Sequence, residues 1–240
     1  MRVQGGLKKE DWLHWGEYST FKSNAADLLR RSLRPEHVIY CSPLTDPYQP
    51  AESTAQLMPG ILEAVIASPP KVFVIQTRGP LILRDIDLLS TLNTRTILRV
   101  SFSVTTNQED IRRIFEPHCA PIGERLRVLR VLSEAGIATS VALAPILPCD
   151  PDELVELAIN CSTGPLIADP FDVRSVKRSG ATTRTAAAAI CRHHGWNEWL
   201  DPAYQRHVIL RLASRASMLG REFGHGPAGF GLLASGSSPC

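Results

Sequence analysis

The chain has 240 residues, of which 44% are hydrophobic and 21% charged, and its net charge at neutral pH is +2. These proportions are ordinary for a folded globular protein and exclude a largely disordered chain. No apolar run approaches the roughly 20 residues that span a bilayer, and the first residues lack the apolar stretch of a secretion signal. The sequence therefore predicts a cytoplasmic protein with no membrane partner.

Helices with apolar residues on one face are predicted over 24–33, 55–67, 83–92, 108–115 and 122–135. Short apolar and β-branched runs predict strands over 37–41, 71–76, 96–104, 139–147 and 166–171. The strand starts recur at intervals of 25 to 43 residues, which is the length of a strand plus a crossover helix. This alternation favours a parallel α/β barrel or a doubly wound sheet.

Two helix starts carry capping signals. Asp150, Pro151 and Glu153 supply the N-cap, N1 and N3 residues of a helix that follows the fourth strand. Asn107 with Asp110 three residues later resembles an N-cap pair for the helix at 108–115.

The pattern changes after residue 173. An Ala-rich helix is predicted over 181–192, a Trp-bearing turn over 194–199 and a long helix over 202–219. We therefore expect a barrel over residues 1–175, a helical extension over 176–222 and, because the end of the chain is rich in Gly and Ser, a flexible tail over 223–240.

Basic residues are concentrated in this C-terminal part. Residues 173–240 hold nine Lys or Arg against three Asp or Glu, whereas residues 1–172 hold 17 against 21. A basic region can bind an anionic partner such as nucleic acid, although a solvated helix surface is the simpler explanation of the same charges.

The six cysteines are dispersed, and no two of them lie within ten residues of each other. Reduced thiols are expected in a chain of this length without an export signal. Clustered thiolates of the kind that hold a metal cofactor are therefore missing. Cys191 with His193 and His194 has zinc-type ligands, but a closed zinc site needs four.

Polar residues gather just after the predicted strands, where loops of a parallel barrel converge. Together they would line one opening of the barrel with hydroxyls, carboxylates and a fixed cation, which suits a zwitterionic amino-acid ligand. The residues concerned are Thr45, Asp46, Glu52, Arg78, Ser101 and Ser103. Taken singly, each residue is better explained as a cap of a neighbouring helix or as a hydrogen-bond partner of the loop backbone, but their expected co-location favours a ligand site. Glu116 and Arg125 are expected to form a structural ion pair, and Cys119 is the one cysteine expected to face this opening.

The strings SPLTDPYQPAE, QTRGPLILRDIDLL, SFSVTT, FEPHCAPIGERLRVLRVLSEAGI and APILPCDPDEL follow one another in an order and spacing similar to radical SAM proteins related to spore photoproduct lyase. The likeness covers about residues 8 to 175. It implies a partial (β/α)6 TIM-like barrel of parallel strands, missing its first strand and carrying a helical C-terminal extension. It also implies binding of S-adenosylmethionine (SAM) at the carboxyl ends of the strands, beside a [4Fe-4S] cluster.

In that family a CxxxCxxC loop after the first strand holds the cluster, and an electron from a donor such as flavodoxin or ferredoxin splits bound SAM into a 5′-deoxyadenosyl radical. This sequence begins where the loop should already have ended, so no residue can be assigned as a cluster ligand. The resemblance therefore predicts a truncated or inactive form, with at most weak SAM binding and no radical chemistry of its own.

The resemblance also carries over a SAM pocket. Thr45 and Asp46 correspond to the segment that faces the methionine ammonium, Arg78 to a basic residue near the carboxylate, Ser103 to a hydroxyl near the ribose or carboxylate, and Pro145 to the strand end beside the adenine. The alternative is a cluster-free protein that uses this pocket for binding, or its basic C-terminal region for nucleic acid. A hydrolase is excluded, since the sequence contains no GxSxG or HExxH motif.

Overall fold

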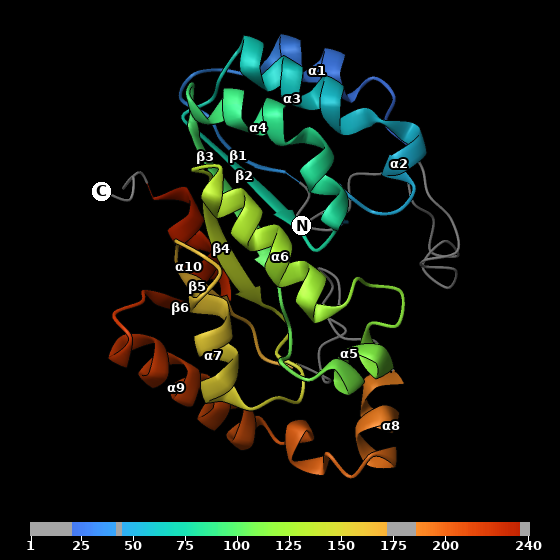
Figure 1. Ribbon diagram of the computed structural model, residues 1–240, viewed down its shortest axis with the longest axis vertical. Helices are drawn as coiled ribbons and strands as arrows, with labels where there is room; N and C mark the ends of the chain where they lie inside the picture. Colours follow the sequence, from blue (N-terminus) through green and yellow to red (C-terminus); the bar gives the residue numbers. More distant parts are fainter. Residues whose placement is uncertain (1–20, 42–44, 172–185, 236–240) are drawn as a thin grey trace.

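The computed structural model describes residues 21–41, 45–171 and 186–235. Its centre is a six-stranded sheet in which all strands run parallel and follow one another in sequence order, β1-β2-β3-β4-β5-β6 (Figure 1). The strands are β1 (Val38–Cys41), β2 (Val72–Thr77), β3 (Ile97–Ser103), β4 (Ala138–Leu143), β5 (Leu166–Ala168) and β6 (Phe223–His225). A doubly wound sheet reverses its strand order at a switch point, whereas this order runs in one direction as in a barrel. The predicted α/β fold of partial-barrel type is confirmed.

One helix precedes the first strand, one follows the last strand, and the others fill the connections between the strands. The helices are α1 (Ala25–Ser32), α2 (Glu52–Ala55), α3 (Leu57–Ala67), α4 (Ile86–Asn93), α5 (Glu109–Phe115), α6 (Ile122–Glu134), α7 (Pro151–Ile159), α8 (Ala186–His193), α9 (Pro202–Met218) and α10 (Gly226–Gly231). Short 3-10 helices occupy Pro80–Asp85, Asn197–Leu200 and Leu232–Ala234, called η2, η3 and η4. Among the described helices, none has both the length and the apolar character that crossing a membrane requires.

The outer face of the sheet packs against the crossover helices. Alternate strand residues point to this side, and Phe73, Ile75 and Phe102 are buried there with Leu62 of α3 and Leu129 of α6. Each fully buried side chain of this size stabilises the fold by about 1.5–3 kcal/mol. The main core therefore lies between the strands and helices α3, α4, α6 and α7.

The opposite, inner face is covered near the amino ends of the strands by the C-terminal segment. Val72 and Val74 of β2 and Ile167 of β5 pack against Leu233 of η4. The Tyr40 hydroxyl donates to the Phe230 carbonyl at 2.8 Å, and Arg99 donates through Nη2 to the Ser235 carbonyl, also at 2.8 Å. Helix α10 with η4 thus closes the bottom of the inner face.

The expectation of a flexible tail is therefore wrong for residues 223–235. β6 pairs with β5 over Leu166↔Phe223 to Ala168↔His225, and α10 packs directly on both strands. A Cβ at Gly224 would lie 2.5 Å from the Gly229 Cα, so glycine is needed there for close backbone approach. Glycine content, which suggested flexibility, reflects tight packing instead. Residues 236–240 and the expected boundary at 175 lie outside the described residues.

The capping predictions have different outcomes. The Asp150 side chain accepts from the amides of Asp152 and Glu153 at 2.9 and 3.0 Å, which confirms the α7 cap. Asn107 does not cap α5, because Gln108 occupies the N-cap position. The Asn107 side chain instead accepts from the Asp150 amide at 3.1 Å and donates to the Glu153 carboxylate at 2.9 Å. Asn107 therefore joins the loop after β3 to the start of α7.

Two strands are shorter than predicted. β4 ends at Leu143 rather than 147, and β5 ends at Ala168 rather than 171. Pro145, which follows β4, has no N–H to donate to a sheet ladder. The apolar residues beyond both ends are still buried, as Ile146, Leu147 and Phe171 show. Burial without sheet pairing produces the same apolar run as a longer strand.

Candidate functional site at the carboxyl ends of the strands

The loop after β1 is tied to the end of β2 by Asp46. Its carboxylate accepts from the Thr77 hydroxyl at 2.6 Å, from the Arg78 amide at 2.8 Å and from the Tyr48 amide at 2.9 Å. A carboxylate with three donors holds its surrounding backbone in one conformation. Asp46 therefore fixes two loops relative to each other at this end of the barrel.

A second set of contacts joins the segments that follow β1 and β2. Glu52 is buried and accepts from Nη2 of Arg84 at 2.9 Å, while Arg84 also makes two hydrogen bonds of 2.8 and 2.9 Å to Asp85. A Cβ at Gly79 would lie 2.2 Å from the Tyr48 carbonyl oxygen, so only glycine fits there. The motifs TDPYQPAE and TRGPLILRD thus bind one another, a pairing that neither motif predicts alone.

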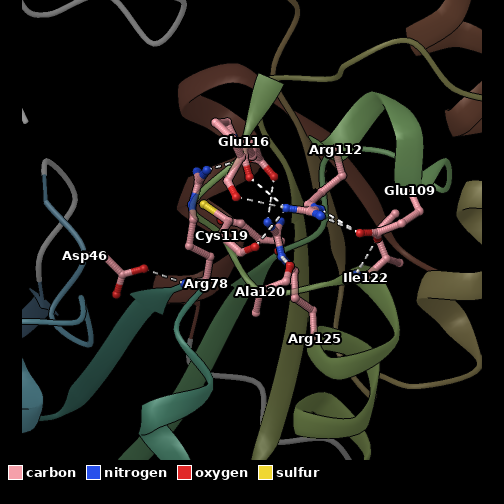
Figure 2. Close-up of polar contacts among 11 residues, drawn as sticks. Asp46, Arg78, Glu109, Arg112, Glu116, Cys119, Ala120, Ile122 and Arg125 are labelled. Atoms are coloured by element: carbon pink, nitrogen blue, oxygen red, sulfur yellow. Dashed lines mark hydrogen bonds and ion pairs between the residues drawn. The ribbon is translucent and has the colours of Figure 1, made fainter. Parts of the chain in front are cut away.

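Arg78 connects this pair of loops to the loop after β3. Its Nη1 lies 2.5 Å from Oε1 of Glu116, and the other carboxylate oxygen of Glu116 lies 2.7 Å from Nη2 of Arg125 (Figure 2). Burial acts to lower the pKa of Arg78, but the charge of Glu116 and contact with Cys119 outweigh it and raise that pKa above its usual value. The Arg78 guanidinium is therefore a fixed cation at the opening of the barrel.

The loop over residues 116–122 is held by further arginine contacts. Arg112 donates to the carbonyls of Glu116 and Cys119 at 3.0 Å each, and Arg125 donates through Nε to the Ala120 carbonyl at 2.9 Å (Figure 2). Glu116 and Arg125 have side chains only 8% and 1% exposed. The predicted structural ion pair is confirmed, and it lies at the centre of a buried network.

Glu109 makes the outermost contacts of this network and gives it a pH dependence. Partial burial acts to raise the pKa of Glu109, but hydrogen bonds from Arg112 and from the Ile122 amide outweigh it and hold that pKa below its usual value of 4.5. Because a lowered carboxyl pKa stabilises the ionised folded protein, this stabilisation is present above about pH 4.5 and lost as the pH falls through the folded pKa.

We expect Glu109→Gln to reduce the loss of stability between pH 5 and the acid transition, measured as the urea midpoint at successive pH values. Asp110→Asn is the matched control, because the Asp110 side chain is 90% exposed and its ion pair with Arg113 is at the surface. Parallel pH profiles for the wild type and Glu109→Gln would contradict the assignment.

The inner face carries a polar layer above the part closed by α10. Gln76, Ser101 and Ser140 lie opposite one another on β2, β3 and β4, and Ser103 lies one step closer to the opening. Ser101 is 1% exposed, and its hydroxyl has no hydrogen-bond partner among the described residues. A buried polar group without a partner costs about 1–3 kcal/mol. A ligand that paired with this hydroxyl would recover that cost.

The five residues predicted to bind SAM all lie at the carboxyl ends of β1 to β4. Thr45 is exposed in the loop after β1, and Ser103 is the last residue of β3 and half-buried. Pro145 follows β4 and is joined to Ala144 by a cis peptide bond. Asp46 and Arg78 meet through the Arg78 amide. Their roles toward SAM stay predictions.

The described residues do not fit an iron–sulfur cluster. No group of three or more His, Cys, Asp or Glu side chains lies close enough to hold a metal ion in the part of the chain that the structure describes, so Cys191, His193 and His194 form no zinc site there either. Burial raises the pKa of Cys41 and of Cys149 to about 12, which disfavours the thiolate form of both side chains. Cluster iron binds thiolates.

Basic residues of the C-terminal region hold helix α9 in place. Arg211 and Arg215 form ion pairs with Asp152 and Glu156 of α7. Arg221 donates to the carbonyls of Ser162 and Gly164, both at 2.9 Å. Part of the local positive charge is thus used within the fold, and nucleic-acid binding by this region stays a prediction.

Comparison of the sequence with family models gives no match. Among individual proteins, the chain is 35% identical over 140 residues to an uncharacterized protein of the Acidianus two-tailed virus, covering 56% of this chain and 44% of that protein. It is 31% identical over 131 residues to an uncharacterized protein of Mycobacterium tuberculosis, covering 53% and 38%. For an uncharacterized protein of Methanocaldococcus jannaschii the identity is 27% over 137 residues, covering 56% and 49%. The chain spans about two fifths to half of the length of these relatives.

Comparison of the fold finds spore photoproduct lyase complexed with dinucleoside spore photoproduct. The TM-score is 0.56 at 13% sequence identity, and the match covers 85% of this chain and 64% of the enzyme. A point mutant of spore photoproduct lyase matches with a TM-score of 0.53 at 12% identity over the same shares. The chain therefore has a fold similar to that of spore photoproduct lyase.

Proposed function

We propose that the chain binds SAM at the carboxyl end of its inner face and forms the SAM-binding part of a radical SAM protein related to spore photoproduct lyase. The observation that carries the proposal is the buried, unpartnered hydroxyl of Ser101, in a polar layer at the end of the barrel where this fold places its ligands. The similar fold of spore photoproduct lyase supports it.

The residues at this opening match the functional groups of SAM. Ser101, Ser103 and Gln76 can hydrogen-bond ribose or carboxylate oxygens, and Arg78 supplies a positive charge for the carboxylate. Glu116, bound to Arg78, limits how far that guanidinium can turn. The α10 segment closes the inner face at the amino ends of the strands, so a ligand enters from the carboxyl ends.

In radical SAM proteins the [4Fe-4S] cluster supplies the electron that splits bound SAM. Since the described residues hold no ligand set for a cluster, we expect SAM binding without SAM cleavage when this chain is tested alone. The measurement is anaerobic incubation with iron, sulfide, dithionite and SAM, followed by chromatography for 5′-deoxyadenosine. The dinucleoside spore photoproduct bound by the similar enzyme is the first substrate to add.

Ser101→Ala tests the site directly. We expect SAM affinity, measured by isothermal titration calorimetry, to fall about 3- to 10-fold, as for the loss of one hydrogen bond. The melting temperature of the ligand-free protein should be unchanged or slightly higher, because the hydroxyl has no partner to lose among the described residues. Loss of affinity without loss of stability distinguishes a ligand contact from a structural one.

Ser162→Ala is the matched control. Its hydroxyl is buried but donates to the Ala158 carbonyl at 2.7 Å on the outer side of the barrel. This variant should lower the melting temperature and leave SAM affinity unchanged. Absence of SAM binding by the wild type at millimolar concentration, or equal affinities for the wild type and Ser101→Ala, would show the proposal to be wrong.

A further inference from the structure

A groove of about 760 Å³ lies at the opposite end of the barrel, at the amino ends of the strands. It is bordered by the ends of α1, α3 and α4, which lie together in Figure 1, and by the starts of β1, β2 and β3. Its position is separate from the SAM site proposed above.

Three cations line this groove. Arg34 precedes β1, Lys71 precedes β2 and Arg95 precedes β3, and all three are exposed. The residues that line the groove include no Asp or Glu. Among the described residues, none of the three cations has a carboxylate partner within ion-pair distance. The contrast with Arg78, Arg84, Arg112 and Arg125, which all have such partners, marks this surface as positively charged.

Local structure accounts for part of this charge. Arg34 donates to the Leu33 carbonyl at 2.8 Å beyond α1, and Arg95 donates to the Ile66 carbonyl at 3.4 Å in α3. A helix carboxyl terminus carries about half a negative elementary charge. The carboxyl ends of α1, α3 and α4 together therefore offset about half of the positive charge of the three cations. The Lys71 side chain makes no hydrogen bond or ion pair with another described residue. A positive excess remains on the groove.

The three cations belong to segments that precede three neighbouring strands of the sheet, β1, β2 and β3. The Val72 amide donates to the His37 carbonyl, and the Ile97 amide donates to the Lys71 carbonyl, so the three strands begin side by side. Neighbouring strands lie about 4.8 Å apart, so the backbone segments that carry the cations follow one another along the sheet edge. Such a row fits a chain of regularly repeated negative charges better than a single phosphate.

We propose that this groove binds the sugar–phosphate backbone of a single nucleic-acid strand. Lysine and arginine are the usual phosphate contacts, and the groove also presents Ser68 and Asn93 as polar neighbours. Its lining contains no aromatic side chain on which a base could stack. Binding is therefore independent of base sequence and depends strongly on salt.

The experiment is fluorescence anisotropy of a labelled 20-nucleotide thymidine oligomer with the full chain at 50 to 200 mM salt. The triple variant Arg34→Gln, Lys71→Gln, Arg95→Gln is expected to bind at least about 10-fold more weakly at 50 mM salt. The magnitude of the slope of log affinity against log salt should decrease by about 2, since three phosphate contacts are lost and each contact on a single strand contributes about 0.7. SAM affinity should not change.

The matched control replaces three exposed arginines outside the groove and outside the basic C-terminal region, Arg113, Arg127 and Arg130, with glutamine and so removes the same net charge. It should retain wild-type affinity and slope. Lys71→Gln alone should lower the slope by about 0.7 with no change in melting temperature, which separates binding from folding effects.

Several results would overturn the proposal. The first is that the wild type does not bind the oligomer at 50 mM salt. The second is that the groove triple variant and the control triple variant lose equal amounts of oligomer affinity. The third is that the groove cations are needed for binding phosphatidylserine vesicles while the oligomer does not bind.

Discussion

Glu116→Gln is expected to destabilise the protein by about 3–5 kcal/mol, a large part of the 5–15 kcal/mol that is typical of a folded domain. The Glu116 carboxylate lies between Arg78 and Arg125, and the Arg125 side chain is 1% exposed. Glutamine keeps the shape of the side chain but removes its charge, which leaves the Arg125 guanidinium buried without a counter-ion. The measurement is urea unfolding followed by circular dichroism.

Glu124→Gln is the control for this prediction. Glu124 lies in the first turn of α6, close in sequence to Arg125, and is exposed. Its substitution should change stability by no more than about 0.5 kcal/mol. A Glu116→Gln protein as stable as this control would mean that the ion-pair network does not contribute to the fold.

Gly229→Ala is expected to destabilise the protein, whereas Gly231→Ala in the same helix is expected to be neutral or stabilising. A Cβ at position 229 would lie 2.6 Å from the carbonyl carbon of Gly224 in β6, so strand and helix must separate. Overpacking of this kind costs about 1–3 kcal/mol. A Cβ at position 231 meets no atom within 4 Å, and alanine there gains up to about 1 kcal/mol of helix propensity.

Urea unfolding of the two variants, together with limited proteolysis, measures this difference. The Gly229→Ala protein should lose its C-terminal segment to protease sooner than the wild type, because α10 is released from β6. Equal stability of the two variants would show that residues 223–235 are not docked in solution as they are in the structure.

The sequence was sufficient to predict the alternating strands and helices of the fold. Strands β1 to β5, helices α3, α6 and α9, and the start of α7 were predicted within a few residues, because apolar periodicity and the Asp150 cap are local signals. β6 was missed, since a three-residue strand containing Gly224 has no periodicity and depends on contacts with β5 and α10. Contacts between distant segments leave no such local pattern.

The location of the candidate residues was predicted, but only part of their contacts. Thr45, Asp46 and Arg78 were expected at one opening because parallel strands end on the same side, and the structure places them there. The link between Glu52 and Arg84, 32 residues apart, could not be read from either motif alone. Glu52 and Arg84 carry opposite charges and lie in the segments that follow two neighbouring strands. This combination is the signal that could have suggested the pair.

The connections among the loops after β1, β2 and β3 make them one cooperative unit. Asp46 fixes Arg78 through its backbone amide, Arg78 contacts Glu116, and Glu116 contacts Arg125 on α6. Substitutions in different loops should therefore be strongly non-additive in double-mutant cycles. Evolution would be constrained in the same way, because a change in one of these motifs would be tolerated only together with a compensating change in another.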